Sequence, residues 1–259
     1  MPSWQTKKVL IVVKTYPTPA LDGVEVSCTA GITEQGEWVR LFPIPYRFLA
    51  FDKRFRRYQW VKVATLRSSD ARPESYKINP TSIELLGKPL DTKRNWQARK
   101  DVVFPLLGHC LCCIKARRDK EGFPTLGIFK PATIEGLVIE PTSDAWTPAE
   151  QAKLDQANQG ALFGKNIVPR EQLEKVPFKF KYRFRCDEAG CNGHTLSCTD
   201  WEMHQAWRDW SRKYGADWES KFRQKFEAEM RAKDAYFYVG TIHRHPENWI
   251  IIGLFYPPR

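Results

Sequence analysis

Aromatic and cationic residues alternate without a break over residues 178–185, which read Phe-Lys-Phe-Lys-Tyr-Arg-Phe-Arg. A period of two is typical of a β-strand, because successive side chains point to opposite faces. The pattern therefore predicts a strand with one aromatic face suited to a protein core. The other face carries a positive charge about every 6.6 Å. We call its four residues the cationic row: Lys179, Lys181, Arg183 and Arg185.

Two interpretations of the cationic row are open at this stage. The row suits the binding of phosphate groups along a nucleic-acid backbone. Alternatively, the strand lies at the edge of a sheet, where lysines and arginines keep other strands from docking. The rest of the chain has to decide between them.

The first 140 residues show short apolar runs separated by glycine and proline turns. This spacing predicts a small β-barrel or sandwich, and we expect one small OB-like barrel, or two in tandem, over residues 1–140. Residues 24–32 and 37–41 read as a hairpin, and Pro43 and Pro45 end its second strand. The other predicted strands or apolar segments are residues 9–14, 58–66, 82–86, 102–107, 126–129 and 134–139, the last two forming a closing pair around Pro131.

The remaining chain changes character twice. Residues 141–176 read as a linker with a short helix that starts at Thr147 and Pro148. Residues 177–259 predict an α+β region. Its first helix covers residues 199–214, with Thr199 as the cap and Glu202 three residues later. A second helix over residues 218–230 and strands at residues 235–242 and 249–255 complete the region.

Cysteine and histidine gather directly after the cationic row. Four soft or borderline metal ligands within thirteen residues, with glycines between them, predict a zinc knuckle, because a structural zinc ion takes a closed set of four such ligands. The alternative is that Cys198 lies in the core and His194 is a loop residue. The predicted ligands are Cys186, Cys191, His194 and Cys198, with His204, His243 and His245 as replacements for Cys198.

A second group of these residue types occurs at residues 109–113, which read His-Cys-Leu-Cys-Cys. On a strand, neighbouring residues point to opposite faces, so at most two of the four polarisable side chains would meet one metal ion. Buried free cysteines are also ordinary core residues. We therefore interpret His109, Cys110, Cys112 and Cys113 as part of a buried strand or short helix.

The net charge of the chain indicates which kind of partner it could bind. Lysine and arginine outnumber aspartate and glutamate by 41 to 30, for a net charge of +11, and aromatic residues make up 13% of the chain. A surplus of this size favours a polyanionic partner, and interleaved aromatics suit the stacking of bases. Besides the cationic row, the sequence offers a cluster of Arg54, Arg56 and Arg57.

The sequence shows neither a signal-peptide pattern nor an apolar run of membrane-spanning length. We therefore expect a soluble, cytoplasmic protein with no membrane partner. Its seven cysteines are an odd number. They fit a reducing compartment better than a disulfide framework.

Evidence for catalysis is sparse. Asp200 and Glu202 are candidates for holding a magnesium ion in a nuclease. Both acids fall in the first turn of a predicted helix, where capping and the helix dipole already account for them. The chain lacks a glycine-rich phosphate loop, a nucleophile elbow and a His-Glu-x-x-His motif. The sequence favours a protein without enzymatic activity.

Residues 25–32, Glu-Val-Ser-Cys-Thr-Ala-Gly-Ile, and residues 36–43, Gly-Glu-Trp-Val-Arg-Leu-Phe-Pro, resemble the opening of the dual OB-containing domain. In that prokaryotic family a Cys-x-Ala-Gly strand leads to a Gly-x-Trp-(Ile/Val)-Arg strand. The sequence departs from the family after Arg40, where Leu-Phe-Pro stands in place of Pro-Val. The resemblance implies two small β-barrels in the first 140 residues and a role in mobile-element or defence systems.

Three hypotheses for function follow. The first is a zinc-stabilised protein that binds the phosphate backbone of a nucleic acid. The contacts would come from the cationic row and the cluster of Arg54, Arg56 and Arg57. The second is a metal-dependent nuclease that uses Asp200 and Glu202. The third is a subunit of a larger complex whose basic faces meet an acidic protein. A metal-dependent cleavage assay separates the first two, and a salt titration of nucleic-acid affinity separates the first from the third.

Overall fold

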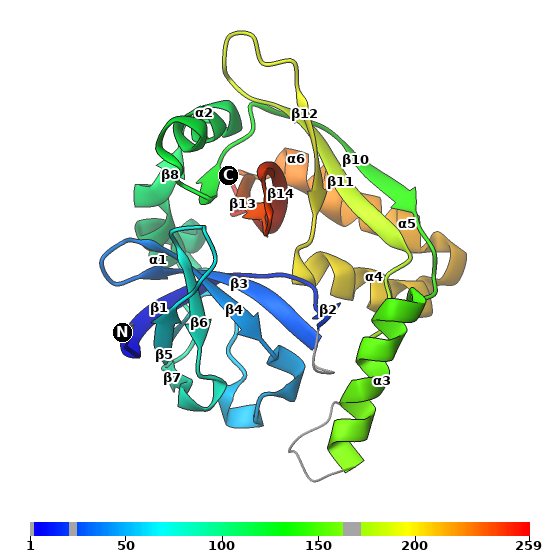
Figure 1. The fold of residues 1–259 in the computed structure, drawn as a ribbon. Helices are drawn as coiled ribbons and strands as arrows, with labels where there is room; N and C mark the ends of the chain where they lie inside the picture. The colour runs from blue at the N-terminus through cyan, green and yellow to red at the C-terminus, as the bar shows by residue number, and fades with distance from the viewer. Residues whose placement is uncertain (1–2, 21–24, 163–171) are drawn as a thin grey trace. The chain divides into compact units, whose positions relative to one another are not determined.

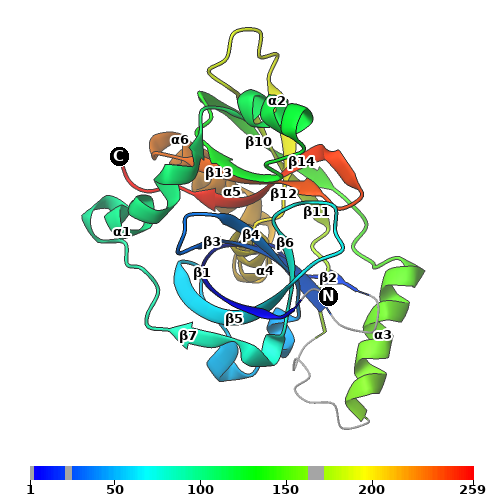
Figure 2. The same cartoon turned by 60° about the vertical axis from the view of Figure 1, so that its left-hand side comes forward.

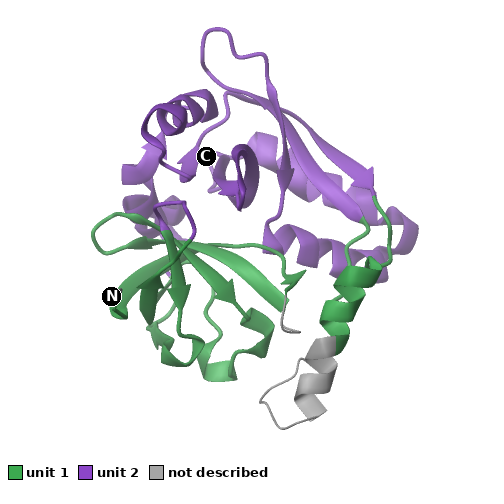
Figure 3. Ribbon diagram, viewed as in Figure 1, with its two compact units in different colours: residues 1–69, 75–89, 142–177 green, residues 70–74, 90–141, 178–259 purple. Residues whose placement is uncertain are grey.

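The computed structural model describes residues 3–20, 25–162 and 172–259. The chain divides into two compact units (Figure 3). The first unit takes residues 1–69, 75–89 and 142–177, and the second takes residues 70–74, 90–141 and 178–259. Residue 24 of the predicted hairpin and residues 163–171 of the predicted linker lie outside the described residues. Within the described ranges, no helix is both long and apolar enough to cross a membrane.

The first unit contains a closed five-stranded barrel (Figures 1 and 2). The strands follow the order β1-β3-β4-β6-β5, and antiparallel pairing of β5 with β1 closes the ring. β4 and β6 pair in parallel, and β2 and β7 extend the sheet from β3 and β5. The strands are β1 (Gln5–Lys14), β2 (Thr18–Pro19), β3 (Glu25–Thr33), β4 (Trp38–Ile44), β5 (Gln59–Arg67), β6 (Ser75–Ile78) and β7 (Glu84–Leu86).

Alternate residues of the strands fill the interior of this barrel, as expected for a side-chain period of two. Along β5, Val61 and Val63 are buried and Lys62 between them is exposed. The barrel predicted for the N-terminal part is therefore confirmed. β4 runs through Pro43 to Ile44, so Pro43 does not end this strand as expected. The buried cluster comprises Val9, Ile11, Val39, Leu41, Ile44, Leu49, Phe55, Val61, Val63, Ile78 and Ile83.

The expectation of a second barrel within residues 1–140 is wrong for the described part of that range. One barrel ends with β7 at Leu86, and residues 90–141 belong to the second unit. β6 has no apolar pattern that predicts a strand, because the residues around it are mostly polar. β6 pairs with both β4 and β5, so it is the strand that joins the two halves of the barrel.

The second unit is built on a sheet with the order β10-β11-β12-β14-β13-β9-β8. The pairings β10–β11, β11–β12, β13–β14 and β9–β13 are antiparallel, whereas β12–β14 and β8–β9 are parallel. The strands are β8 (Leu107–Gly108), β9 (Leu126–Phe129), β10 (Thr133–Pro141), β11 (Phe178–Arg185), β12 (His194–Cys198), β13 (Tyr236–Ile242) and β14 (His245–Phe255).

β9 and β10 do not form the expected closing pair. β9 pairs with β13, and β10 pairs with β11 near the opposite end of the strand order. Only residues 130–132 connect them, and three residues span about 10 Å. The sheet must therefore curl until its two ends come close. β9 and β10 act as successive halves of one bent strand, with the bend at Pro131.

β11 forms as the alternating pattern predicts. Phe180, Tyr182 and Phe184 are buried, whereas Lys179, Arg183 and Arg185 are exposed. β11 lies between β10 and β12 and pairs with both, so the interpretation of the cationic row as an edge-strand device is wrong. The edge at β10 is instead covered by Arg223 and Arg231, which donate hydrogen bonds to carbonyl oxygens of this strand.

Helices α2, α3 and α4 begin where side chains satisfy free backbone groups. Thr147 and Glu150 exchange hydrogen bonds ahead of α3, as a capping box does. The helices are α1 (Lys93–Val103), α2 (Leu111–Glu121), α3 (Pro148–Leu162), α4 (Trp201–Tyr214), α5 (Trp218–Arg223) and α6 (Glu229–Ala232), and a π-helical turn (Gln224–Ala228) joins α5 to α6. Short 3₁₀ turns occupy Tyr46–Phe48, Phe51–Lys53, Pro80–Ser82, Phe104–Leu106 and Gly215–Asp217.

The cap of α4 is Asp200, one residue later than the predicted Thr199. One carboxylate oxygen of Asp200 accepts hydrogen bonds from the backbone N–H groups of Glu202 and Met203, at 2.9 and 3.1 Å. The other oxygen accepts from the N–H of Leu254 on β14 at 3.1 Å. Asp200 therefore joins the helix to the sheet.

Asp200→Ala should destabilise the second unit by more than an ordinary cap substitution. Loss of the cap costs about 0.5–2 kcal/mol. The buried N–H of Leu254 also loses its acceptor, at about 1–3 kcal/mol. Urea denaturation measures the effect, and the exposed Glu202→Ala variant is the control, expected within about 0.5 kcal/mol of wild type. Equal stability of the two variants would contradict this role of Asp200.

Candidate metal centre

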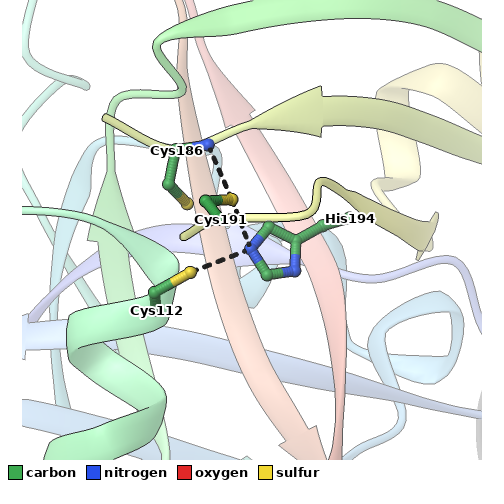
Figure 4. A group of neighbouring side chains, drawn as sticks. All are labelled: Cys112, Cys186, Cys191 and His194. Carbon is green, nitrogen blue, oxygen red and sulfur yellow. Dashed lines mark hydrogen bonds between the residues drawn. The ribbon is translucent and has the colours of Figure 1, made fainter. Parts of the chain in front are cut away.

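Three cysteines and one histidine of the second unit converge at the tip of the β11–β12 hairpin (Figure 4). Cys186 directly follows β11, Cys191 lies in the connecting loop, and His194 is the first residue of β12. Cys112 comes from the first turn of α2. We call these four residues the hairpin-tip cluster.

The ligand atoms of the hairpin-tip cluster all lie within 4.8 Å of one another. The Nε2 atom of His194 is 3.2 Å from Sγ of Cys112 and 3.5 Å from Sγ of Cys191. Ligands of a tetrahedral zinc ion are separated by about 3.3–3.8 Å, since zinc–sulfur and zinc–nitrogen bonds are about 2.3 and 2.0 Å long. The cluster can therefore hold a metal ion with little rearrangement.

The loop geometry depends on two glycines. Gly190 and Gly193 have φ values of 83° and 87°, in the left-handed region that disfavours other residues. Between them, the N–H of Cys191 donates to the carbonyl oxygen of Glu188 at 3.0 Å and closes a turn. The glycines predicted to supply the turns of a metal knuckle do so.

The cysteines of the cluster influence one another's pKa values, because neighbouring thiolates would repel. Burial, together with the nearby Cys186, raises the pKa of Cys112 to about 12. Hydrogen bonds from the backbone N–H groups of Cys186 and Gly193 lower the pKa of Cys191. Burial lowers the pKa of His194, which favours the neutral ring that a metal requires. A divalent cation would stabilise the thiolates that otherwise repel one another.

Cys198, the fourth ligand expected from the sequence, is not part of the cluster. It is the last residue of β12, where it is buried and pairs with Phe180 and Ile251. Four residues of extended strand place it about 13 Å from His194. The expectation treated residues 186–198 as one compact loop, whereas the last five form a strand.

Cys112 occupies the fourth position of the cluster, where it is half-buried rather than fully within the core. Residues 111–121 form a helix that begins beside the hairpin tip, which is one of the two structures expected from the sequence. The only signal in the sequence was the crowding of three cysteines at residues 110–113. Nothing in their spacing links them to residues 186–194.

The other proposed ligands and acids have different roles. His204 is buried on α4, and its Nδ1 atom lies 2.8 Å from the carbonyl oxygen of Asp200. Burial lowers the pKa of His204 to about 4. His243 contacts Asp70, and His245 is near Glu247. Asp200 itself accepts the three backbone hydrogen bonds described above, which leaves no observation in favour of a magnesium site.

Two of the three arginines clustered in the first unit bond to backbone carbonyl groups. Arg54 donates to the carbonyl oxygens of Leu49 and Arg47, and Arg57 donates to that of Val12. Both guanidinium groups therefore help to hold the barrel loops. Arg56 is exposed. The three arginines do not form a row comparable to that on β11.

Two family descriptions match the chain. One, given as "Domain of unknown function (DUF8757)", matches residues 108–259, which include the whole hairpin-tip cluster and β11. The other, given as "Domain of unknown function (DUF8758)", matches residues 5–105. No curated protein matches the chain.

Proposed function

We propose that this chain, which belongs to the DUF8757 family through residues 108–259, is a zinc-stabilised protein that binds nucleic-acid backbones through the cationic row. The observation that carries the proposal is the position of the row. Its four cations lie on one face of an interior strand, and Lys179, Arg183 and Arg185 on that face are exposed to solvent.

The strand order supports an OB-like architecture for both units. In the first barrel the first three strands (β1, β3, β4) are neighbours, the third is parallel to the fifth (β6), and the fourth (β5) returns to the first. The second unit repeats this order if β9 and β10 count as one bent first strand. Helices α4–α6 then lie between its third and fourth strands. OB-folds commonly bind oligonucleotides.

Zinc is the metal that best suits the hairpin-tip cluster. Three thiolates and one imidazole form a closed set of four, which is typical of structural rather than catalytic zinc sites. The cluster directly follows Arg185, the last residue of the cationic row. A metal ion there would fix the end of β11 and hence the direction of the row.

Two members of the cationic row are paired with acids of the neighbouring strand. Lys181 contacts Glu140, and Arg185 donates to Glu135 at 2.6 Å. Lys179 and Arg183 are exposed, and among the described residues neither makes a side-chain hydrogen bond or an ion pair within 4 Å, although Lys179 stands opposite Glu140 in the strand register. We therefore assign the main phosphate contacts to Lys179 and Arg183.

Hydroxyl groups lie beside the row on β12. Thr195 pairs with Arg183 and Ser197 pairs with Lys181, and paired residues of antiparallel strands share a face. Hydroxyls and cations together contact phosphates and sugars, which position a nucleic acid without reading its sequence. The expected ligand is therefore a nucleic acid of any sequence.

The double variant Lys179→Ala/Arg183→Ala should weaken binding to all sequences alike. Loss of two phosphate contacts should flatten the dependence of log K on log salt by up to about two units. Fluorescence anisotropy with labelled single- and double-stranded oligonucleotides of unrelated sequence, measured over a range of salt, tests both effects. The fold should persist, because exposed substitutions usually change stability by less than about 0.5 kcal/mol.

The matched control changes the acids instead. Glu135→Gln/Glu140→Gln releases Arg185 and Lys181 from their partners and should strengthen binding and steepen the salt dependence. Opposite changes in the two double variants support the proposal. Absence of binding to DNA and RNA in the wild-type protein, or equal affinity in all three proteins, would refute it.

A further inference from the structure

A second group of metal-ligand side chains lies beside the hairpin-tip cluster and shares no residue with it. The ligand atoms of His109, Cys113 and Glu188 lie within 4.8 Å of one another. Cys110 adjoins this group, with its Sγ atom 3.9 Å from Oε2 of Glu188 and 2.8 Å from Sγ of Cys113. The two sulfur atoms would separate to about 3.8 Å when both bind one zinc ion. We propose that His109, Cys110, Cys113 and Glu188 bind a second metal ion of the zinc class.

Helix geometry explains how adjacent residues serve two centres. Cys112 and Cys113 are consecutive residues of α2, so their side chains leave the helix about 100° apart. Cys112 therefore reaches the hairpin-tip cluster, while Cys113 points to a separate group. On a strand, at most two of residues 109–113 would meet one metal ion. A helix preceded by an extended cap brings Cys110 and Cys113 together.

Cys110 is held in place for this role. It is the cap of α2, and its buried Sγ atom accepts a hydrogen bond from the N–H of Cys113 at 3.1 Å. The sulfur is therefore oriented towards Cys113 by the start of the helix itself.

Glu188, in the loop between β11 and β12, supplies a carboxylate ligand to this group. Its Oε2 atom is 3.3 Å from Sγ of Cys113. A divalent cation at this position would neutralise the two thiolates and the carboxylate together. Sulfur, imidazole nitrogen and carboxylate oxygen are all ligands of zinc.

The second site is more open than the first. His109 and Glu188 are exposed, and Cys113 is half-buried. The hairpin-tip cluster contains no exposed residue. We therefore expect the second ion to exchange with solvent and chelators faster than the first. Both centres join the start of α2 to the loop between β11 and β12, so together they would fasten these two segments at two points.

Zinc titration of reduced, metal-stripped protein tests the proposal, with metal content per chain measured by mass spectrometry. Wild-type protein should bind two equivalents. His109→Ala/Glu188→Gln, which changes only exposed side chains, should bind one equivalent and keep its fold. Cobalt(II) should give thiolate-to-cobalt charge-transfer absorption for each equivalent, and the variant should lose the part that belongs to Cys110 and Cys113.

The variants separate failure of this site from failure of the hairpin-tip cluster. Cys112→Ser should also lose one equivalent, but the loss should be additive with that of the exposed double variant. One equivalent in the wild type that is retained in His109→Ala/Glu188→Gln would overturn the second centre while leaving the first. If the wild type binds one equivalent that is lost in His109→Ala/Glu188→Gln and retained in Cys112→Ser, the hairpin-tip cluster is overturned and the second centre stands. A protein without metal whose intact mass is about two daltons lower, from a Cys110–Cys113 disulfide, would also overturn the proposal.

Discussion

Cys112→Ser should remove one metal ion per chain from the purified protein, whereas Cys198→Ala should leave the metal content unchanged. Cys112 supplies a sulfur atom 3.2 Å from the ring nitrogen of His194, while Cys198 lies at the far end of β12. Serine lacks the thiolate that a structural zinc ion requires. Metal analysis of protein purified without chelator compares the two variants directly.

Loss of this ion should also lower the thermal stability of the second unit. A ligand present at a thousand times its Kd stabilises the native state by about 4 kcal/mol. For a unit of this size that corresponds to about 8–16 °C in Tm. Hydrogen exchange should show that the loop at residues 186–193 and the start of α2 lose protection first. A variant pattern with metal lost in Cys198→Ala and kept in Cys112→Ser would contradict the assignment.

Phe180→Ala should strongly destabilise the second unit. The ring is 1% exposed and stacks on Phe222 of α5 with 4.6 Å between ring centroids. His204 packs against it edge-on at 5.2 Å. Removal of a fully buried phenylalanine side chain costs about 3–5 kcal/mol, because the surrounding residues fill the cavity only in part.

The neighbouring Lys179→Ala variant is the control for Phe180→Ala. It alters the same strand on its exposed face, where the change in unfolding free energy should stay within about 0.5 kcal/mol. Urea denaturation followed by tryptophan fluorescence measures both variants. A loss below 1 kcal/mol for Phe180→Ala would show that the aromatic face of β11 does not carry the core of this unit.

The strands and helices that the sequence predicted correctly have strong local patterns. In β11 every second residue is aromatic, and this periodicity holds whichever strands lie beside it. The start of α3 was equally clear, because Thr147 and Glu150 are close in the chain and bond to each other. Short apolar runs predicted β1, β3 and β5 for the same reason. The misplaced cap of α4 shows the limit of such signals, since Thr199 and Asp200 are both good caps and only the contact with Leu254 distinguishes them.

The errors concern residues whose roles depend on distant partners. β6 carries little apolar signal, but it lies between β4 and β5 in the barrel. β9 and β10 are neighbours in sequence and pair with different strands, because the sheet curls through the bend at Pro131. Cys112 lies beside His194 at the hairpin tip, although the two residues are 82 positions apart in the sequence.

The sequence by itself determined the alternating strand with its cationic row, three of the four residues of the hairpin-tip cluster and the barrel character of the N-terminal part. Each of these rests on residues that are close in the chain, where side-chain period and turn geometry act locally. Only the tertiary structure decided that Cys112 replaces Cys198, that β11 is an interior strand, and that Glu135 and Glu140 pair with half of the cationic row. Those outcomes depend on which strands pair and in what register, and the folding of the whole sheet sets both.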